Sequence, residues 1–195
     1  MLILFVSTSV FAQSQVRIAT VDLGRVFTNY WKTKQAQTAI DEKKADIEKT
    51  GREMLDTFNK SKEDYQKMLD SANDPAVSSE ERDKRKKAAE DKLKDLKDQQ
   101  DALQQFDRGS STSLDEQLKR TRDNILADIR TAVTAMAKSD GYTLVLDTAS
   151  QSINATPVIL YSAPGDNDIT DKVIKQINMG APADMPKADD KPEAK

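Results

Sequence analysis

The 195-residue chain contains neither cysteine nor histidine. This composition excludes disulfide frameworks, zinc sites built from cysteine or histidine, cysteine nucleophiles and every acid–base mechanism that needs an imidazole. The six glycines are isolated from one another and form no phosphate-binding loop. Aspartate and glutamate are abundant, but they alternate with lysine and arginine as on a solvated helix surface. We therefore expect no catalytic residues, no metal site, no bound cofactor and no enzymatic activity.

Apolar and aromatic residues are also scarce, at 37% and 5% of the chain, whereas 32% of residues are charged. A compact globule of this length needs more apolar area to offset its chain entropy, so this balance favours long solvated helices that bury a narrow stripe. Lysine and arginine number 30 against 33 aspartates and glutamates, for a net charge of −3. Proteins that bind nucleic acid through its phosphates usually carry a basic excess, so no nucleic acid is expected as a partner.

Residues 1–12 resemble the end of a secretory signal peptide. The segment up to Phe11 is apolar, uncharged and too short to span a bilayer, and Ala12 supplies the small residue expected before the cleaved bond. The basic segment that usually precedes such an apolar run is missing. The alternative interpretation is a buried strand or an N-terminal helix. We expect cleavage before Gln13 and export of the rest of the chain.

A helical pattern extends over about residues 23–72. Apolar residues recur there in two rows at heptad spacing, which predicts a coiled-coil seam. The rows are Ile40, Ile47, Met54 and Met68, and Phe58, Tyr65 and Ala72. Lys44, Gly51 and Ser61 interrupt this seam. Asn73-Asp74-Pro75 is expected to end the helix, because proline lacks an amide proton and restricts the preceding residue.

A second helix is predicted from Ser78 to about Ser139. Ser78 and Glu81 have the spacing of a capping box, and acidic residues in the first turn suit the helix dipole. Arg108–Ser113 contains poor helix formers, so we expect a continuous but soft helix at this point. The short connection predicts an antiparallel helical hairpin over residues 25–139, with its tip near 73–78.

Short apolar runs outside the hairpin predict three strands, at Val16–Val21, Tyr142–Leu146 and Thr156–Tyr161. A short helix is predicted from about Asp168 to Asn178, with Asp168 or Thr170 as its cap. Residues 180–195 alternate proline, alanine, lysine and acidic residues, which is typical of a disordered tail.

The expected fold is therefore α+β, because the predicted strands lie at both ends of the chain and must meet in one small β head. This head comprises residues 13–24 and 140–179. Three strands and one helix make a marginal core, so we expect several copies to associate and complete it. The residues expected as core or inter-chain contacts are Ile18, Val21, Leu144, Leu146, Val158, Ile159 and Leu160.

Three segments of the chain, which follow one another in the order found in the family, resemble the Skp/OmpH family of periplasmic chaperones for outer-membrane proteins. They are Arg17–Phe27 (RIATVDLGRVF), Tyr142–Asp147 (YTLVLD) and Asp168–Ile177 (DITDKVIKQI). The resemblance implies a jellyfish-like homotrimer, in which a β-barrel head built from three chains carries three hairpin arms around a cavity. It also implies a periplasmic holdase that binds unfolded outer-membrane proteins in that cavity without ATP.

The arms are expected to contact such clients diffusely. Candidate contacts are Met54, Phe58, Tyr65, Met68 and Phe106, although seam packing within the hairpin would equally account for each of them. A basic cluster near the tip comprises Arg82, Lys84, Arg85, Lys86 and Lys87. This basic cluster would attract acidic clients, lipid phosphates or nucleic acid, whereas its acidic neighbours favour an ordinary solvated helix face. The family resemblance also implies contact with a membrane surface or lipopolysaccharide through basic arm residues, without assigning it to particular positions. The arms are nearly neutral here, while well-known family members have strongly basic arms.

Two other functions remain compatible with the sequence. One is a structural or adaptor coiled coil of the cell envelope, which would bind a folded partner and have little affinity for unfolded barrels. The other is a nucleic-acid or lipid-surface binder that acts through the basic cluster and depends steeply on salt.

Overall fold

The computed structural model describes residues 16–163, 165 and 167–183. The predicted signal peptide and the predicted tail from residue 184 onward lie outside these residues. The elements follow the order β1, α1, α2, α3, β2, α4. The chain forms two compact units. The terminal unit contains the described residues up to Lys34 and from Asn124 onward, and the hairpin unit contains Gln35–Asp123.

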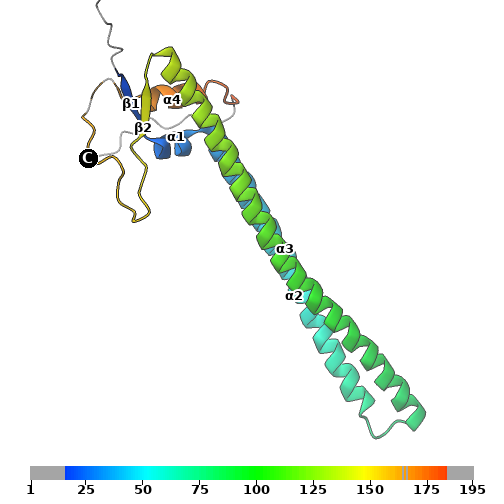
Figure 1. The fold of residues 1–195 in the computed structure, drawn as a ribbon. Coiled ribbons are helices and arrows are strands. Elements are labelled where there is room, and N and C mark those ends of the chain that lie inside the picture. Colours follow the sequence, from blue (N-terminus) through cyan, green and yellow to red (C-terminus); the bar gives the residue numbers. More distant parts are fainter. Residues whose placement is uncertain (1–15, 164, 166, 184–195) are drawn as a thin grey trace, which may run out of the picture. The chain divides into compact units, whose positions relative to one another are not determined.

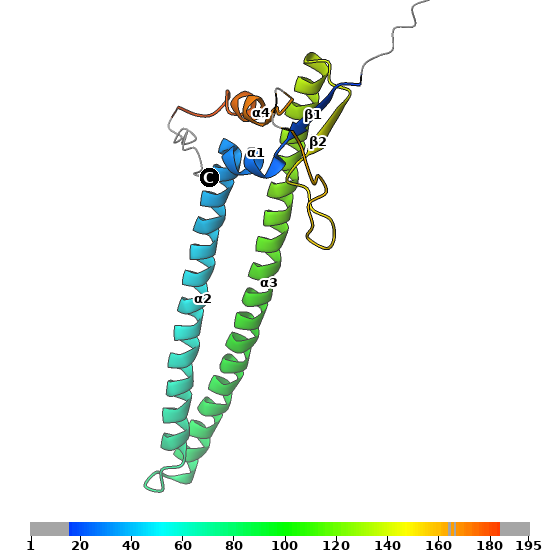
Figure 2. The same cartoon turned by 90° about the vertical axis from the view of Figure 1, so that its left-hand side faces the viewer.

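Strands β1 (Ile18–Val21) and β2 (Leu144–Asp147) form a parallel pair in the terminal unit, as Figures 1 and 2 show. Ile18 lies opposite Leu144, and Val21 lies opposite Asp147. Both strands begin two residues later than predicted. The carbonyl of Arg17 accepts hydrogen bonds from the amide and the hydroxyl of Thr143, at 2.8 and 2.9 Å, so the chain is already held together just before the strands begin.

The two edges of this sheet differ. On the outer side of β1, the amide of Thr20 donates to the Asn167 carbonyl and the amide of Ile169 donates to the Thr20 carbonyl, both at 2.9 Å. On β2, the amides of Leu144 and Thr148 donate toward β1. Since the direction of the amides alternates along a strand, every second amide between them points to the opposite edge. Within the described residues no strand pairs with that edge.

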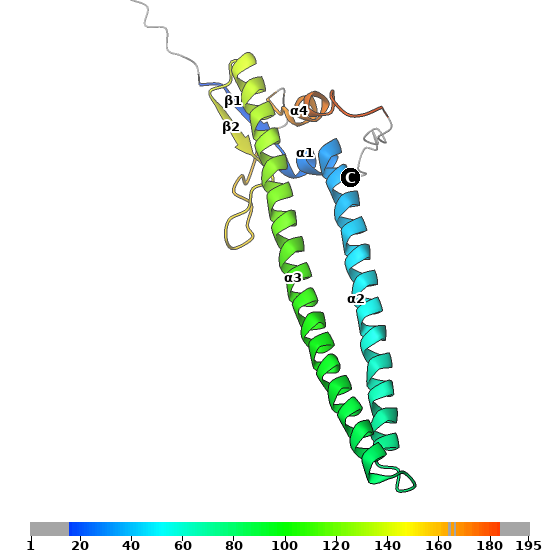
Figure 3. The same cartoon turned by 90° about the vertical axis from the view of Figure 1, so that its right-hand side faces the viewer.

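Helices α1 (Leu23–Asn29) and α4 (Thr170–Ile177) contribute to the core of the terminal unit, and they lie near each other in Figure 3. The buried apolar residues of this unit are Ala19, Val21, Val26, Tyr30, Ile125, Ile129, Ile169 and Val173. One sheet face, with Ala19 and Val21, is therefore covered. The opposite face leaves Ile18 and Leu144 exposed at 42% and 47%.

The predicted first helix is broken at Tyr30, which is a correction to the sequence analysis. Tyr30 has an extended backbone (φ −77°, ψ 130°) and separates α1 from α2 (Trp31–Ala72). The side chain of Asn178 supplies the hydrogen bonds lost at the break. Its Oδ1 accepts from the Trp31 amide at 2.9 Å, and its Nδ2 donates to the Asn29 carbonyl at 3.0 Å.

The start of α4 also differs from its prediction. Its N-cap is Ile169, and no side chain caps it there. Asp168 instead accepts from the amide of Thr170 at 2.9 Å, and the hydroxyl of Thr170 accepts from the amide of Asp22 at 2.9 Å. These polar groups therefore tie α4 to the end of β1 rather than form the predicted cap.

In the hairpin unit, α2 and α3 (Ser79–Ser139) run antiparallel and are joined by residues 73–78 (Figure 2). A Cβ atom at Gly51 would lie 3.6 Å from the Phe106 ring, so these residues face each other across the hairpin. The amide of Glu81 donates to the Ser78 hydroxyl at 3.4 Å, which confirms this half of the predicted capping box. Helix α3 is continuous through 108–113, as predicted.

The prediction of a strand at Thr156–Tyr161 is wrong for the single chain. Residues 150–158 instead double back as a narrow turn, in which Val158 N donates to Ser150 O at 3.0 Å (yellow in Figure 1). Ala155 adopts a left-handed φ of 56°, a position that glycine usually takes in such turns. Gln151 and Pro157 form only an isolated bridge, and among the described residues no strand continues it.

Candidate functional site

The predicted head residues fall into two groups. Ile18 and Leu144 lie opposite each other on the exposed sheet face, and Leu146 is half-buried two residues further along β2. Val21 belongs to the covered face and is 2% exposed, so it is a core residue of its own chain. The exposed members form an apolar surface on which another polypeptide can pack.

The segment that follows the 150–158 turn is exposed and apolar. Val158 is 55% exposed and Leu160 is 88% exposed, whereas Ile159 is half-buried. Tyr161 and Ile153, which lie outside the predicted set of head contacts, are also exposed. This segment has the composition of a strand but no strand partner among the described residues. Together with the open edge of β2, it can pair with further backbone.

The predicted client contacts of the hairpin unit are mostly half-buried. Met54, Phe58, Tyr65 and Phe106 are partly covered, and Met68 is 38% exposed. Packing along the seam of the hairpin therefore covers part of the surface of each of these side chains. Leu55 and Leu118 are more exposed than the predicted contacts other than Met68. Leu55 was not among the predicted contacts because it lies off the two heptad rows.

The five residues of the basic cluster differ in exposure. Arg85 is half-buried, with its Nε 3.1 Å from Glu81 Oε1 and its Nη1 donating to the Ser71 hydroxyl at 2.9 Å. Arg82 is also half-buried and donates to the Val77 carbonyl at 3.5 Å. These two arginines hold the tip of the hairpin together. The exposed lysines of the cluster are Lys84, Lys86 and Lys87.

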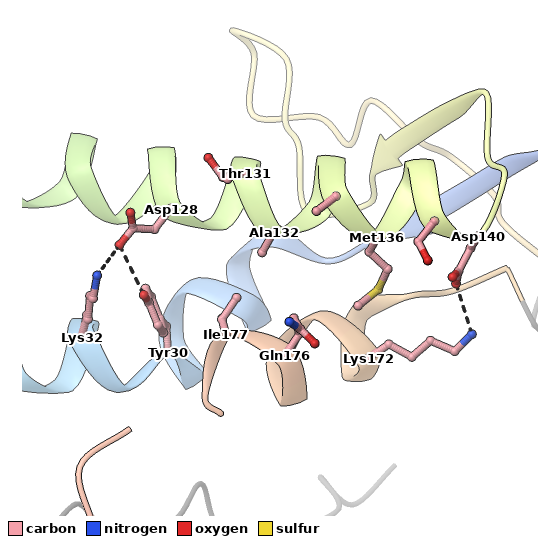
Figure 4. Close-up of a pocket in the computed structure, with 12 residues that line it drawn as sticks. Tyr30, Lys32, Asp128, Thr131, Ala132, Met136, Asp140, Lys172, Gln176 and Ile177 are labelled. Carbon is pink, nitrogen blue, oxygen red and sulfur yellow. Dashed lines mark hydrogen bonds and ion pairs between the residues drawn. The ribbon is translucent and has the colours of Figure 1, made fainter. Parts of the chain in front are cut away.

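The terminal unit also contains a groove of about 780 Å³, which no pattern in the sequence indicated. Figure 4 shows a polar cluster at one end, where Lys32 Nζ lies 2.7 Å from Asp128 Oδ2 and the Tyr30 hydroxyl donates to the same oxygen at 3.3 Å. At the other end, Lys172 Nζ lies 3.7 Å from Asp140 Oδ2. Apolar side chains, including those of Ala132, Met136 and Ile177, lie between the two ends.

The polar cluster shifts the titration of its members. The hydrogen bond from Lys32 holds the pKa of Asp128 below its ordinary value, and the same bond raises the pKa of Lys32. Burial raises the pKa of Tyr30. The pair is partly exposed, at 44% for each side chain, so water screens its attraction.

We expect Asp128→Asn to lower the free energy of unfolding by about 0.5 kcal/mol at pH 7, because an ion pair of this exposure contributes little. Because the pKa of Asp128 is lower in the folded protein than in the unfolded chain, its contribution to stability is complete above the unfolded pKa, at about pH 4. This contribution is lost as the pH falls through the pKa of the folded protein. The difference between the two proteins should therefore vanish at strongly acidic pH. The raised pKa of Lys32 makes its contribution complete below about pH 10.5 and lost at higher pH.

Urea unfolding of both proteins across this pH range measures the difference. The matched control is Asp115→Asn, which removes an exposed carboxylate of the hairpin unit. An equal decrease in the free energy of unfolding at pH 7 for the two variants would contradict the role of the Asp128 ion pair.

In the part of the chain that the structure describes, no group of three or more acidic side chains is placed to hold a metal ion. No helix within these residues is long and apolar enough to cross a membrane. The described residues bring together three surface features: an open sheet edge, a set of exposed apolar side chains and a groove.

Comparison with characterised proteins gave no match. By contrast, a family model described as "Outer membrane protein (OmpH-like)" matches residues 17–177. This range contains every helix and strand of the described chain, from β1 to the end of α4. The chain therefore belongs to the OmpH-like family.

Proposed function

We propose that the protein is an ATP-independent holdase of the periplasm, which binds unfolded outer-membrane proteins and prevents their aggregation. The observation that carries this proposal is the family match over residues 17–177. A holdase acts by binding the unfolded client, so the proposal needs no catalytic residue and no cofactor.

The proposed active form is a homotrimer, with a small β-barrel head built from strands of three chains. Support comes from the open edge of β2 and from the exposed segment after Val158, which lacks a strand partner within the described chain. Pairing between the edge of one copy and the segment of another would bury unpaired backbone groups on both. Ile18, Leu144 and Leu160 would be covered by the same association.

The proposed clients suit a diffuse binding surface. Strands of an outer-membrane barrel alternate apolar and polar residues, and they aggregate when they are unpaired. Many weak contacts with partly exposed side chains such as Leu55, Met68 and Leu118 can hold such a chain without a specific pocket. Contact with an anionic membrane surface would fall to Lys84, Lys86 and Lys87, and it should be weak because the net charge is small.

The test is light scattering of a denatured outer-membrane barrel protein that is diluted into buffer with and without the chain, in the absence of ATP. We expect suppressed aggregation and a complex whose mass corresponds to one client per three chains. A folded protein of similar mass serves as the control for crowding. Unchanged aggregation in the presence of a well-folded oligomer would contradict the holdase proposal and favour an envelope adaptor.

A further inference from the structure

The groove of the terminal unit arises because the apolar stripe of α3 continues past the first turn of α2. Ile125, Ile129, Ala132 and Met136 follow heptad spacing along α3. Ile125 and Ile129 are 5% and 1% exposed. Between them, Asp128 meets Lys32 in the first turn of α2. Since α2 begins at Trp31, the turns of α3 that follow Ile129 are not covered by residues of α2.

Helix α4 covers these turns only partly. Gln176 and Ile177 of α4 line the groove together with Ala132, Ala135 and Met136 of α3, and Figure 4 shows Met136 between the two helices. Ala132 is half-buried and Ala135 is exposed. Because both are small, the space of about 780 Å³ stays open, and this volume lies within the range of about 300–1,000 Å³ that is usual for ligand sites.

The charges at the groove indicate what it can hold. Each end carries one ammonium group and one carboxylate within ion-pair distance, so neither end has a net charge. A strongly anionic or cationic ligand would therefore gain no net attraction. The lysines and carboxylates keep hydrogen-bonding capacity beyond their pairs, and Lys172 is 61% exposed. A neutral ligand with donors and acceptors along its length suits both ends.

We propose that this groove binds a short, uncharged, apolar segment of polypeptide in an extended conformation. The peptide backbone supplies donors and acceptors for the polar groups at the two ends. Its apolar side chains pack on Ala132 and Ile177 and on Met136, whose flexible thioether adapts to varied shapes. This inference rests on the proposed holdase function and assigns part of client binding to the terminal unit.

The probe is a synthetic decapeptide that alternates leucine, valine and tyrosine with serine and threonine, and that carries no charge and no tryptophan. Trp31 is the only tryptophan of the chain, and its ring lies 6.1 Å from that of Tyr30, which lines the groove. We expect a saturable change in Trp31 emission as the peptide is added. Ala132→Phe should weaken binding roughly tenfold because the ring fills the groove.

Two further variants separate the groove from general effects. Ala127→Phe places the same ring at an exposed alanine of α3 that does not line the groove, and it should leave peptide affinity unchanged. Ala135→Leu fills the groove from an exposed position, so it should fold normally and weaken binding. Circular dichroism and mass measurements check folding and assembly in each case.

Several results would overturn the proposal. These are an unsaturable response of the wild-type chain, equal affinity in Ala132→Phe, displacement of the peptide by a fatty acid, or a change in oligomer mass that is specific to the groove variants. The barrel-aggregation assay distinguishes failure of the groove proposal from failure of the holdase proposal. Protection of the barrel without peptide binding would overturn the groove and leave the holdase function standing, whereas peptide binding without protection would support the groove alone.

Discussion

A shortened hairpin is expected to lose most of the protection against aggregation of a barrel client. The variant lacks residues 52–72 and 79–105, so that Gly51 leads through the native loop 73–78 to Phe106. This connection is feasible because Gly51 and Phe106 face each other across the hairpin. The deletion removes most of the partly exposed apolar residues of the hairpin unit, which include Met54, Leu55, Phe58, Tyr65 and Met68. Light scattering should approach that of the client alone, with at most a small residual protection from the terminal unit.

The terminal unit provides the control for this deletion, because all of its hydrogen bonds and its core lie outside the removed residues. The oligomeric state of the shortened chain should therefore equal that of the full chain, as judged by light-scattering mass. Full protection by the shortened chain at the same concentration would show that the arms do not hold the client. The groove of the terminal unit would then become the principal candidate.

The largest effect on stability is expected from Ile129→Ala. The side chain of Ile129 is 1% exposed and belongs to the core of the terminal unit. Its truncation removes buried methyl and methylene groups and leaves a cavity, which costs about 2–5 kcal/mol. Urea unfolding monitored by circular dichroism should show this loss as a lower midpoint.

The matched control is Ile153→Ala, because Ile153 is fully exposed, at 102%. The same truncation there should change the free energy of unfolding by no more than about 0.5 kcal/mol. Both variants must be compared at one chain concentration, since association of copies would add to the apparent stability. Similar losses in the two variants would contradict the core assignment of Ile129.

The elements that local patterns specify were predicted well from the sequence. The heptad rows and the proline after Asp74 indicated two long helices and the loop between them, and the apolar runs indicated β1 and β2. The break at Tyr30 was missed because its hydrogen bonds come from Asn178, which follows Asn29 by 149 residues. No local pattern around Tyr30 contains that information.

The remaining differences have the same origin. Thr156–Tyr161 has the composition of a strand, but a strand also needs an adjacent edge, and none pairs with this segment within the residues that the structure describes. The groove was not predicted because its ends are formed by Lys32 with Asp128 and by Asp140 with Lys172, and these pairs join distant parts of the sequence. The apolar seam residues were identified, but their degree of exposure depends on which partner helix covers each turn.

The long separation between β1 and its partners bears on the order of folding. The amide of Asp22 bonds the Thr170 hydroxyl across 148 residues, and the amide of Leu23 bonds Asp147 across 124. Closing such loops directly costs more entropy, and topologies rich in distant contacts fold slowly. Contacts between α2 and α3 close to residues 73–78 join positions that are nearer in sequence. When these contacts form progressively from the loop outward, they shorten the free chain between β1 and β2 that must still close to form the sheet. The hairpin should therefore form first, and the sheet edge that we propose for assembly should form last.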